Sequence, residues 1–304
     1  MTRDETLVVS IDGQIVAPER ATVSVLDRGF LYGDSVFEVM RAYDRRVFAL
    51  QEHVDRLMRS AGLVYIEVPV DAARLAAELT AAVQASPYPD TIVRVHVTRG
   101  IAPLGLDPTP ARGALRVVIV APVHPPTLED YRSGIAVTTH RTERAADNTE
   151  AAGAKVANYL VSLLALRAAR VVGSKEAIIV DGRGRVLEGA SSNVFLVKDG
   201  VVLTPPVTEG ILPGITRSYL LRSAEALGIP LRITTLTRGD LAGADEVFVT
   251  STVREVLPVV VVDAREVSDG KPGPMTRALH RRFREFTGAS GPLPWEDHEG
   301  SETV

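Results

Sequence analysis

Short apolar runs with strand character, separated by turn residues, recur through most of this 304-residue chain and limit the folds that it can adopt. In the first part of the chain, two strand pairs around tight turns are followed by two helical patterns and two further strands. Short connections of this kind favour antiparallel pairing, so this part predicts a mixed α/β unit. The patterns lie, in order, at residues 7–16, 35–50, 51–64, 71–86, 91–100 and 114–123.

A cluster of prolines at Pro122, Pro125 and Pro126 interrupts this pattern and predicts a break between domains. Given usual domain lengths, we expect a small N-terminal α/β domain at 1–122, a linker at 123–133 and a large C-terminal domain at 134–287. The composition of residues 288–304 predicts a disordered tail. The fold class is therefore α/β (α+β) with two domains. Strand and helix patterns of the second half lie at 135–140, 156–173, 176–188, 193–204, 215–228, 246–263 and 275–286.

Composition excludes several classes of function. The chain has no cysteine, which excludes disulfides, thiolate zinc sites and iron–sulfur clusters and fits a reducing cytoplasm. A net charge of −4 argues against a nucleic-acid partner, and neither a signal peptide nor a membrane span is visible. The nucleotide-binding, zinc-hydrolase and serine-hydrolase motifs are missing, so we expect no bound metal ion. Because the chain lacks cysteine and a visible signal peptide, we expect a cytoplasmic protein.

Lysine chemistry has only four candidates in this chain. Schiff-base formation requires an amine that is partly dry, so that it can be neutral and nucleophilic. Lys175, Lys198 and Lys271 stand in polar or turn segments, whereas Lys155 is surrounded by Gly, Ala and Val and precedes a strongly apolar helical pattern. On position alone, a surface lysine at a helix start remains an equal alternative.

The segment Lys155-Val-Ala-Asn-Tyr159-Leu resembles the lysine segment of class IV, or fold type IV, enzymes that use pyridoxal 5'-phosphate (PLP). That family includes branched-chain aminotransferases, D-amino acid aminotransferases, (R)-amine transaminases and aminodeoxychorismate lyases. Six further segments resemble the family in the right order, over about residues 7–285. They are LDRGFLYGDSVFE (26–38), EHVDRL (52–57), VTRG (97–100), EGASSNVF (188–195), LPGITR (212–217) and FVTSTVREVLPV (248–259).

The resemblance implies PLP as the cofactor and assigns roles around its ring. Lys155 would form the aldimine, and Glu188 would keep the pyridine nitrogen protonated, which makes the ring an electron sink. Tyr159 would hydrogen-bond the phenolic oxygen, and Asn193 would order the adjacent loop. Leu212 resembles the residue packed behind the ring. Taken alone, Glu188 is equally an acid at a strand end and Tyr159 a core tyrosine.

The resemblance also implies a phosphate site. Arg56 would supply the cation, although a solvated helix arginine is the ordinary alternative. Gly214, Ile215 and Thr216 open a helical pattern, and free N–H groups at a helix start bind anions. Ser251 and Thr252 would add hydroxyl and backbone donors.

The substrate is the least determined part of the resemblance. EGASSNVF and FVTST are more similar to D-amino acid aminotransferases. Leu104 and Leu106, however, stand where that group has an arginine and a histidine that trap a carboxylate, and Phe37 stands where it has a tyrosine. These three residues are more similar to branched-chain members. We expect Arg28 to bind the substrate carboxylate, with a turn-stabilising role equally open. Tyr32 and Val253 complete the expected substrate residues.

The function predicted is transfer of an amino group to 2-oxoglutarate or pyruvate from D-amino acids, with (R)-amines as further donors. The first alternative is a branched-chain L-amino acid aminotransferase. An aminodeoxychorismate lyase and a PLP-binding protein without turnover are further alternatives. Family members are dimers, so we expect a homodimer in which residues 28–37 reach the neighbouring subunit's site.

Overall fold

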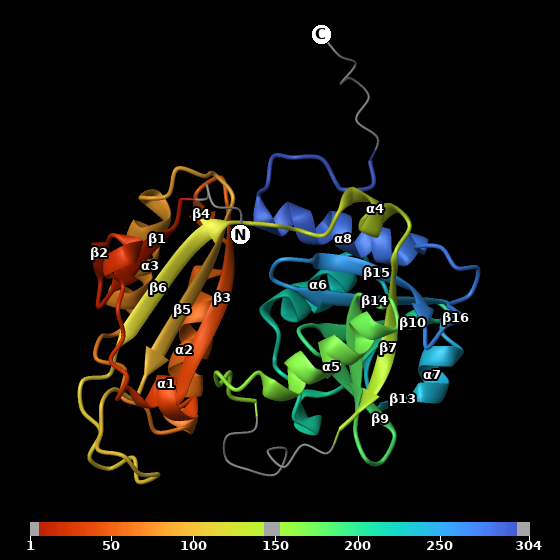
Figure 1. The fold of residues 1–304 in the computed structure, drawn as a ribbon. Coiled ribbons are helices and arrows are strands. Elements are labelled where there is room, and N and C mark those ends of the chain that lie inside the picture. The colour runs from red at the N-terminus through yellow and green to blue at the C-terminus, as the bar shows by residue number, and fades with distance from the viewer. Residues whose placement is uncertain (1–5, 143–152, 297–304) are drawn as a thin grey trace. The chain divides into compact units, whose positions relative to one another are not determined.

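The computed structural model describes residues 6–142 and 153–296, and the chain divides into two compact units. Unit 1 comprises Met1–His124 and Asn148–Tyr159, and unit 2 comprises Pro125–Asp147 and Leu160–Val304 (Figure 1). The first crossing between units falls close to the expected linker. The assignment of Lys155 differs from the expectation, since the segment that carries it belongs to unit 1 instead of the large C-terminal domain. The expected linker also contains a short helix, α4 (Leu128–Arg132), with a buried Tyr131.

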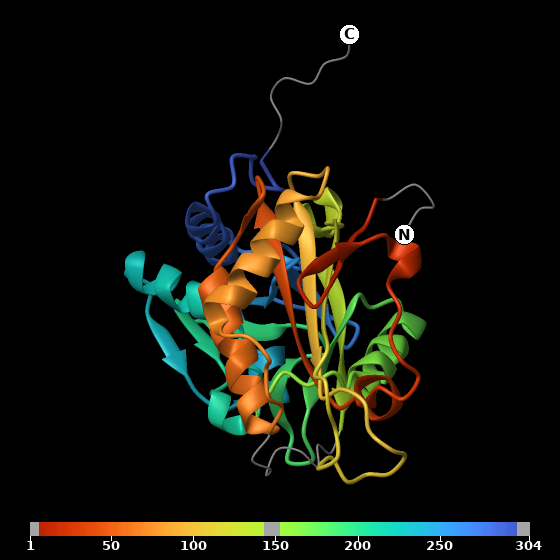
Figure 2. The ribbon, with the colours of Figure 1, turned by 90° about the vertical axis from the view of Figure 1, so that its left-hand side faces the viewer.

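Unit 1 is a six-stranded sheet with two helices on one face. The strand order is β2-β1-β6-β5-β3-β4, and all pairs are antiparallel. Helices α2 and α3 lie side by side across the sheet (Figure 2). The elements are β1 (Val8–Ile11), β2 (Gln14–Val16), a 3-10 turn (Pro18–Arg20), α1 (Arg28–Tyr32), β3 (Ser35–Tyr43), β4 (Arg46–Val47), α2 (Leu50–Leu63), α3 (Ala72–Gln84), β5 (Thr91–Thr98) and β6 (Arg116–Pro122).

The core of unit 1 follows from the sequence pattern. Burial alternates along β5, where Val93, Val95 and Val97 are fully buried and face the helices. Leu57 of α2 and Leu79 of α3 meet these valines in one cluster of buried side chains. A sheet with one face on such a core has the hydrophobic-in pattern that the sequence shows.

Unit 2 is built on a ten-stranded sheet of mixed direction. The order is β12-β11-β10-β14-β15-β7-β8-β9-β13, with β16 paired to β15. The elements are β7 (Ile135–Arg141), α5 (Leu160–Val171), β8 (Glu176–Val180), β9 (Arg185–Gly189), β10 (Asn193–Lys198), β11 (Val201–Thr204), a 3-10 turn (Val207–Glu209), α6 (Ile215–Ala226), β12 (Leu231–Ile233), β13 (Leu236–Thr237), α7 (Arg238–Ala242), β14 (Glu246–Ser251), β15 (Glu255–Val262), β16 (Arg265–Glu266) and α8 (Pro274–Thr287).

The central strands of unit 2 are buried on both faces. Strand β8 is buried at all of its positions, because Ile179 faces α5 while Ile178 faces a separate cluster on the other side. Continuous apolar runs are typical of strands covered on both faces. The predicted α/β (α+β) class is confirmed by these two sheets and their helices.

Two expectations about local structure are corrected. The helix expected from residue 156 begins at Leu160, because the peptide groups of Lys155 and Ala157 are used in pairing with β3. The disorder expected from residue 288 does not hold for residues 288–296, since Leu293 is buried and the Trp295 ring lies 4.5 Å from that of His280. The rest of that tail lies outside the described residues. Within the described ranges, none of the helices has the length and apolar character needed to span a bilayer.

Candidate active site

Lys155 is held at the edge of the unit 1 sheet by main-chain pairing. Its carbonyl accepts from Phe37 N at 3.1 Å, and Ala157 N donates to the Ser35 carbonyl at 2.9 Å, so residues 155–157 extend the edge of β3. The Lys155 N–H donates to Ser60 Oγ at 3.1 Å. The Lys155 Nζ lies 4.3 Å from the centre of the Phe37 ring. The amine therefore stands on a rigid strand against an aromatic face.

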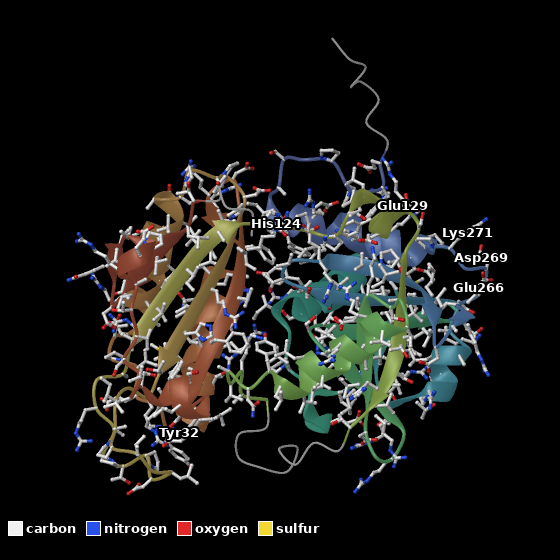
Figure 3. All side chains as sticks on the ribbon, viewed as in Figure 1. Tyr32, His124, Glu129, Glu266, Asp269 and Lys271 are labelled. Atoms are coloured by element: carbon white, nitrogen blue, oxygen red, sulfur yellow. The ribbon has the colours of Figure 1, made fainter. Side chains whose placement is uncertain are left out.

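The other three lysines are used elsewhere. Lys175 forms an ion pair with Asp130, and Lys198 Nζ lies 3.2 Å from Asp245 Oδ1. Lys271 is exposed in a turn beside Asp269 (Figure 3). The apolar setting that distinguished Lys155 in the sequence is thus present in the structure.

A buried charge cluster in unit 1 is centred on Glu38 of β3. Its two carboxylate oxygens accept from Arg56 Nε at 2.6 Å and Arg56 Nη2 at 2.7 Å, which is the bidentate geometry of a strong pair. His53 Nδ1 lies 2.8 Å from Glu38 Oε2. His53 and Arg56 are three residues apart on α2 and so share one face of the helix. The orientation of Arg56 is therefore determined by Glu38.

The titration of this cluster follows from its pairing. Burial alone would raise the pKa of Glu38, but hydrogen bonds and charge from Arg56 and His53 outweigh it and lower that pKa to about 2. Burial lowers the pKa of His53, and the charges of Arg56 and Lys155 act in the same direction, although the hydrogen bond and charge of Glu38 oppose the shift. At neutral pH the cluster thus holds an ionised Glu38 and a neutral His53 beside the Arg56 guanidinium.

An aromatic group with one cation surrounds the Lys155 segment within unit 1. The Phe37 ring centre is 5.1 Å from that of Tyr159 and 5.5 Å from that of His96. The Arg94 guanidinium carbon is 5.0 Å from the Phe37 ring centre, and Arg94 Nε donates to His96 Nε2 at 2.6 Å. Desolvation and the charge of Arg94 lower the pKa of His96 to about 4, which keeps its Nε2 an acceptor.

Tyr159 stays protonated in this group. Burial raises the pKa of its hydroxyl above the ordinary value, although the charge of Arg94 opposes the shift. The hydroxyl therefore remains available as a hydrogen-bond donor at neutral pH.

Unit 2 brings together a second set of expected residues around Glu188. The carboxylate of Glu188, at the end of β9, accepts from Leu212 N at 3.1 Å. Asn193 Nδ2 donates to the Leu212 carbonyl at 2.9 Å. The two side chains thus fix the backbone of Leu212 from both sides, just before α6 begins.

The start of α6 has the properties of an anion site. Gly214 is the N-cap residue, and within the described residues no side chain caps this end of the helix. A Cβ at Gly214 would lie 2.0 Å from the Asn193 side-chain oxygen, so the close approach requires glycine. The side chains of the next two residues, Ile215 and Thr216, are buried.

The turn between β14 and β15 carries Ser251, Thr252 and Val253. It is closed by the pair Ser251–Glu255 at the ends of the two strands. Arg254 in this turn donates to Glu176 Oε2 and to Ser191 Oγ, each at 2.8 Å. Glu176 is fully buried and also accepts from Ser191 and Ser192, which follow the Glu188 strand. Arg254 thereby joins the β14–β15 turn to the turn after Glu188.

Comparison with known proteins identifies the family. The sequence model of the family described as amino-transferase class IV matches residues 35–262. The chain belongs to the class IV aminotransferases. The branched-chain-amino-acid aminotransferase of Escherichia coli (strain K12) is 36% identical over 290 residues, which cover 93% of this chain and 94% of that one. The D-alanine aminotransferase of Staphylococcus haemolyticus is 35% identical, with 91% and 97% covered.

A solved structure agrees with this assignment. The T.th. branched-chain amino acid aminotransferase with pyridoxamine 5'-phosphate superimposes with a TM-score of 0.87 at 33% identity, covering 93% of this aminotransferase and 95% of that chain. The predicted enzyme class, the fold type and PLP as cofactor are therefore confirmed. The predicted preference for D-amino acids is not confirmed, and the comparisons fit the branched-chain alternative better.

One expected substrate residue of this aminotransferase has another role in the structure. Every nitrogen of the Arg28 guanidinium donates within unit 1: Nε to Asp34 at 2.8 Å, and Nη1 and Nη2 to the carbonyls of Gly105 and Leu106 at 3.0 and 3.1 Å. The Tyr32 hydroxyl, labelled in Figure 3, accepts from Gly105 N at 3.1 Å. These contacts support the turn-stabilising role that the sequence left open for Arg28, which shapes the loop at 104–107, and its role as a carboxylate ligand stays a prediction.

Leu104 and Leu106 stand at the tip of that loop, and their exposed fractions are 76% and 80%. They were expected to line the substrate site together with Phe37. In unit 1, Phe37 is buried beside Lys155, whereas these two leucines project from the loop. The structure thus brings Phe37 to the lysine and leaves the role of both leucines a prediction.

Sequence reasoning missed several residues of the two sets. In unit 1 it missed Glu38, His53, Ser60, Arg94 and His96, and in unit 2 it missed Glu176, Ser191 and Arg254. Glu38 and His53 lie inside quoted motifs, so a buried Glu on a strand and an i, i+3 His–Arg pair were available signals. Arg94 carries no local signal, because its importance depends on the pairing of β5 with β3.

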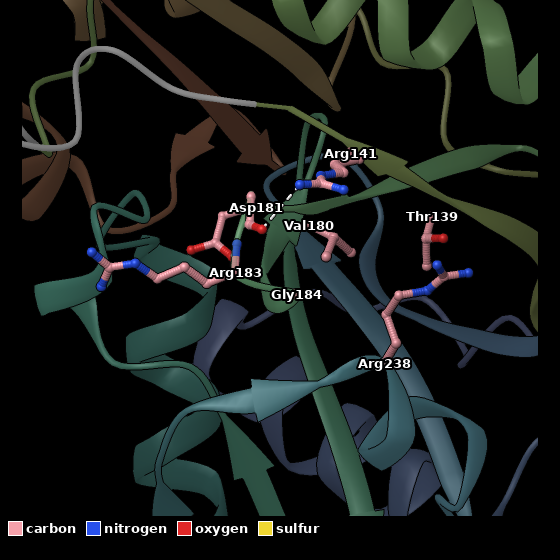
Figure 4. A pocket seen from close by; sticks show the side chains of 8 residues that line it. Thr139, Arg141, Val180, Asp181, Arg183, Gly184 and Arg238 are labelled. Atoms are coloured by element: carbon pink, nitrogen blue, oxygen red, sulfur yellow. Dashed lines mark hydrogen bonds between the residues drawn. The ribbon is translucent and has the colours of Figure 1, made fainter.

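A separate hollow of about 270 Å³ lies in unit 2 beside the β8–β9 turn (Figure 4). Its lining contains none of the expected site residues. Two of its arginines are engaged locally, Arg141 with the Gly182 carbonyl at 3.1 Å and Arg238 with Asp263 at 2.9 Å. The hollow therefore adds nothing to the site. It is lined by Thr139, Arg141, Val180, Asp181, Gly182, Arg183, Gly184 and Arg238.

Proposed function

We propose that this class IV aminotransferase transfers the amino group of a branched-chain L-amino acid to a 2-oxo acid such as 2-oxoglutarate. The observation that carries the proposal is the surroundings of the Lys155 amine, which are aromatic on Phe37 and Tyr159 with Arg94 as the nearby cation. Apolar walls suit an aliphatic side chain, and one cation suits a carboxylate. The named branched-chain relatives support the same donor.

The residues present fit PLP. Lys155 offers an amine on a fixed strand, and Glu188 offers a carboxylate whose other contacts hold Leu212. The uncapped start of α6 offers N–H groups for a phosphate, with Ser251 and Thr252 in the β14–β15 turn as further donors. Arg56 would supply the phosphate cation from unit 1. When bound, PLP supplies an electron sink that stabilises negative charge at the substrate α-carbon.

The chain's own residues would then act as follows. The Lys155 amine would take the proton from the substrate α-carbon and hold it for return on the same face, acting first as a general base and then as a general acid. The Glu188 carboxylate keeps the ring nitrogen protonated, because an ionised partner favours the charged pyridinium. The Tyr159 hydroxyl, held protonated by burial, donates a hydrogen bond to the cofactor's ring oxygen.

Arg94 replaces Arg28 as our candidate for a substrate carboxylate. It lies in the aromatic group next to Lys155, 5.0 Å from the Phe37 ring centre and 5.8 Å from the Tyr159 ring centre. Its Nε is fixed by His96, which orients the planar guanidinium for a bidentate partner. Phe37 and Val253 would contact the aliphatic part of the donor.

We also propose that the enzyme is a homodimer that acts in the cytoplasm. Support comes from the apolar side chains that each unit exposes. Phe30 and Leu31 of α1 are exposed in unit 1, and Leu160, Leu163 and Val171 of α5 are exposed in unit 2. Large contiguous patches of exposed apolar side chains mark interaction surfaces. Light scattering on the purified protein would test the mass, and a monomer at micromolar concentration would refute the dimer.

A half-reaction screen tests the donor. The PLP-loaded enzyme is mixed with L-leucine, L-valine, D-alanine, D-glutamate or an (R)-amine without acceptor, and the loss of the cofactor's visible absorption is followed. We expect the L-branched-chain amino acids to react, with recovery on adding 2-oxoglutarate. If only D-alanine or D-glutamate reacted, the enzyme would be a D-amino acid aminotransferase. Pyruvate release from aminodeoxychorismate would indicate the lyase, and no bleaching by any amine would indicate a binding protein.

A further inference from the structure

A second buried charge cluster lies in unit 2 and contains none of the expected site residues. Glu255, the first residue of β15, is fully buried, and its Oε2 lies 2.7 Å from His280 Nε2. Its Oε1 accepts from Arg284 Nη1 at 2.8 Å. His280 and Arg284 are four residues apart on α8 and therefore share one face of that helix. Two side chains of α8 thus contact the two oxygens of the Glu255 carboxylate.

The backbone of Glu255 is in a conformation that side chains disfavour. Its φ is +55°, in the left-handed region that costs free energy for any residue with a Cβ. Such a residue persists only when its surroundings hold it in place. The carboxylate contacts to α8 provide that restraint at the point where the β14–β15 turn ends.

Further contacts fix the neighbouring residue, Arg254. The Tyr131 hydroxyl of α4 donates to the Arg254 carbonyl at 2.9 Å, while the Arg254 side chain reaches the buried Glu176. The Tyr131 and Trp295 rings lie 5.8 and 4.5 Å from the His280 ring, so aromatic groups enclose the cluster. The turn is thus anchored toward α8 on one side and toward the Glu188 strand on the other.

We propose that Glu255 is a positioning residue, clamped by His280 and Arg284, that sets the Ser251–Arg254 turn in its binding geometry. The inference rests on the proposed role of Ser251, Thr252 and Val253 in holding the cofactor phosphate and the donor. Glu255, His280 and Arg284 contact one another, and in this proposal they act on the site through the turn. They act because a displacement of one ångström in a binding turn can lower activity strongly even when the change lies far from the chemistry.

Glu246 provides a matched control for a merely structural role. It is also a buried glutamate at the start of a strand, and it also contacts α8, accepting from Met275 N at 2.9 Å and Thr276 N at 2.7 Å. It lies at the opposite end of β14 from the turn. Glu246→Gln and Glu255→Gln should therefore destabilise unit 2 in similar ways, but only the second should displace the turn.

The test compares these variants as holoenzymes. We expect Glu255→Gln to raise the PLP dissociation constant and the donor KM roughly 10- to 100-fold, with a smaller change in kcat. Glu246→Gln should leave both constants within about twofold at a comparable loss of melting temperature. Glu255→Gly tolerates the positive φ but lacks the clamp, so it should show the same rise in KM as Glu255→Gln. Normal constants in Glu255→Gly, or equal constants in Glu255→Gln and Glu246→Gln, would overturn the proposal.

Two further variants keep the result decisive. If Glu255→Gln does not fold, Arg284→Met removes half of the clamp and is judged by the same constants. The double variant Ser251→Ala with Thr252→Ala tests the turn's own role. If it leaves the PLP dissociation constant unchanged, the proposed role of the turn fails and the positioning inference fails with it. If it raises that constant while the Glu255 variants do not, only the positioning inference fails.

Discussion

The two units hold their candidate site residues by different physical means. Unit 1 holds charged side chains by pairing and hydrogen bonding, with Glu38 between Arg56 and His53 and with Arg94 oriented by a hydrogen bond to His96. Unit 2 supplies backbone N–H groups at the start of α6 and hydroxyl groups in a turn, with Glu188 as its carboxylate. A single substitution can therefore remove a charged group of unit 1, whereas it can only distort the backbone N–H donors of unit 2.

The largest effect expected in this comparison comes from Lys155. Lys155→Ala removes the only lysine that lies on an aromatic face in the described part of the chain, and it should lower transamination by roughly 10⁴-fold or more. Steady-state assays with L-leucine and 2-oxoglutarate would measure the loss. The control is Lys175→Ala, which removes a lysine paired with Asp130 and should keep full activity. Peptide mapping after borohydride reduction that finds the cofactor on another lysine would contradict the assignment.

The second largest loss of activity is expected from a substitution of Glu188 in unit 2. Glu188→Gln keeps the hydrogen bond from Leu212 N but cannot hold a ring nitrogen protonated, so proton abstraction should slow by about 10²- to 10³-fold. Stopped-flow measurement of the half-reaction isolates this step. Glu209→Gln changes another buried glutamate of the same unit and should leave the rate alone. An unchanged rate in Glu188→Gln would refute the electron-sink role.

The charge cluster of unit 1 predicts a pH dependence. Glu38 has an ordinary pKa of 4.5 and a folded pKa of about 2, so its stabilisation is complete above pH 4.5 and is lost as the pH falls toward 2. The shift corresponds to about 3 kcal/mol of unfolding free energy. Urea unfolding of the cofactor-free protein between pH 2 and 6 should show this slope, and Glu38→Gln should flatten it. Parallel pH profiles for the two proteins would show that Glu38 is not the group responsible.

The smallest effect is expected at Arg28, whose guanidinium is held by Asp34 and by the carbonyls of the loop that it shapes. Arg28→Lys should raise the KM of every amino donor by only a few-fold, because it loosens the loop without removing a substrate contact. Arg94→Lys is the matched comparison, and it should raise the KM of donors that carry a carboxylate more than the KM of (R)-amines. A selective loss of carboxylate-bearing donors in Arg28→Lys would restore Arg28 as a direct ligand.

Local pattern was enough to predict the longer helices and strands and the fold class, while it left Lys155 open between a cofactor lysine and a surface lysine. Helix α2 and strands β5 and β6 fall where periodicity placed them. The start of α5 was misplaced because residues 155–157 also have helical apolar spacing. Only pairing with β3, over one hundred residues earlier, decides their conformation.

Long-range partners explain what could not be predicted. The Glu38–Arg56 pair depends on how α2 packs on β3, and the Glu255 clamp depends on how α8 packs on β15. Arg28 stayed open between a carboxylate ligand and a turn-stabilising residue, because the sequence does not show that the carbonyls of residues 105–107 accept from its guanidinium. The sequence thus indicates which chemistry each residue type can perform, but it does not indicate which hydrogen-bond partners each side chain has in the fold.

The discontinuity of unit 1 has a consequence for how the protein is made. Until residues 155–157 leave the ribosome, one edge of β3 in the segment Met1–His124 has no strand partner there. Unpaired strand edges promote association with other chains. A fragment ended at His124 would have the same open edge and would lack Lys155. The segment that completes this edge of the small sheet is therefore the segment that carries Lys155, so a chain that has formed this pairing holds Lys155 in register.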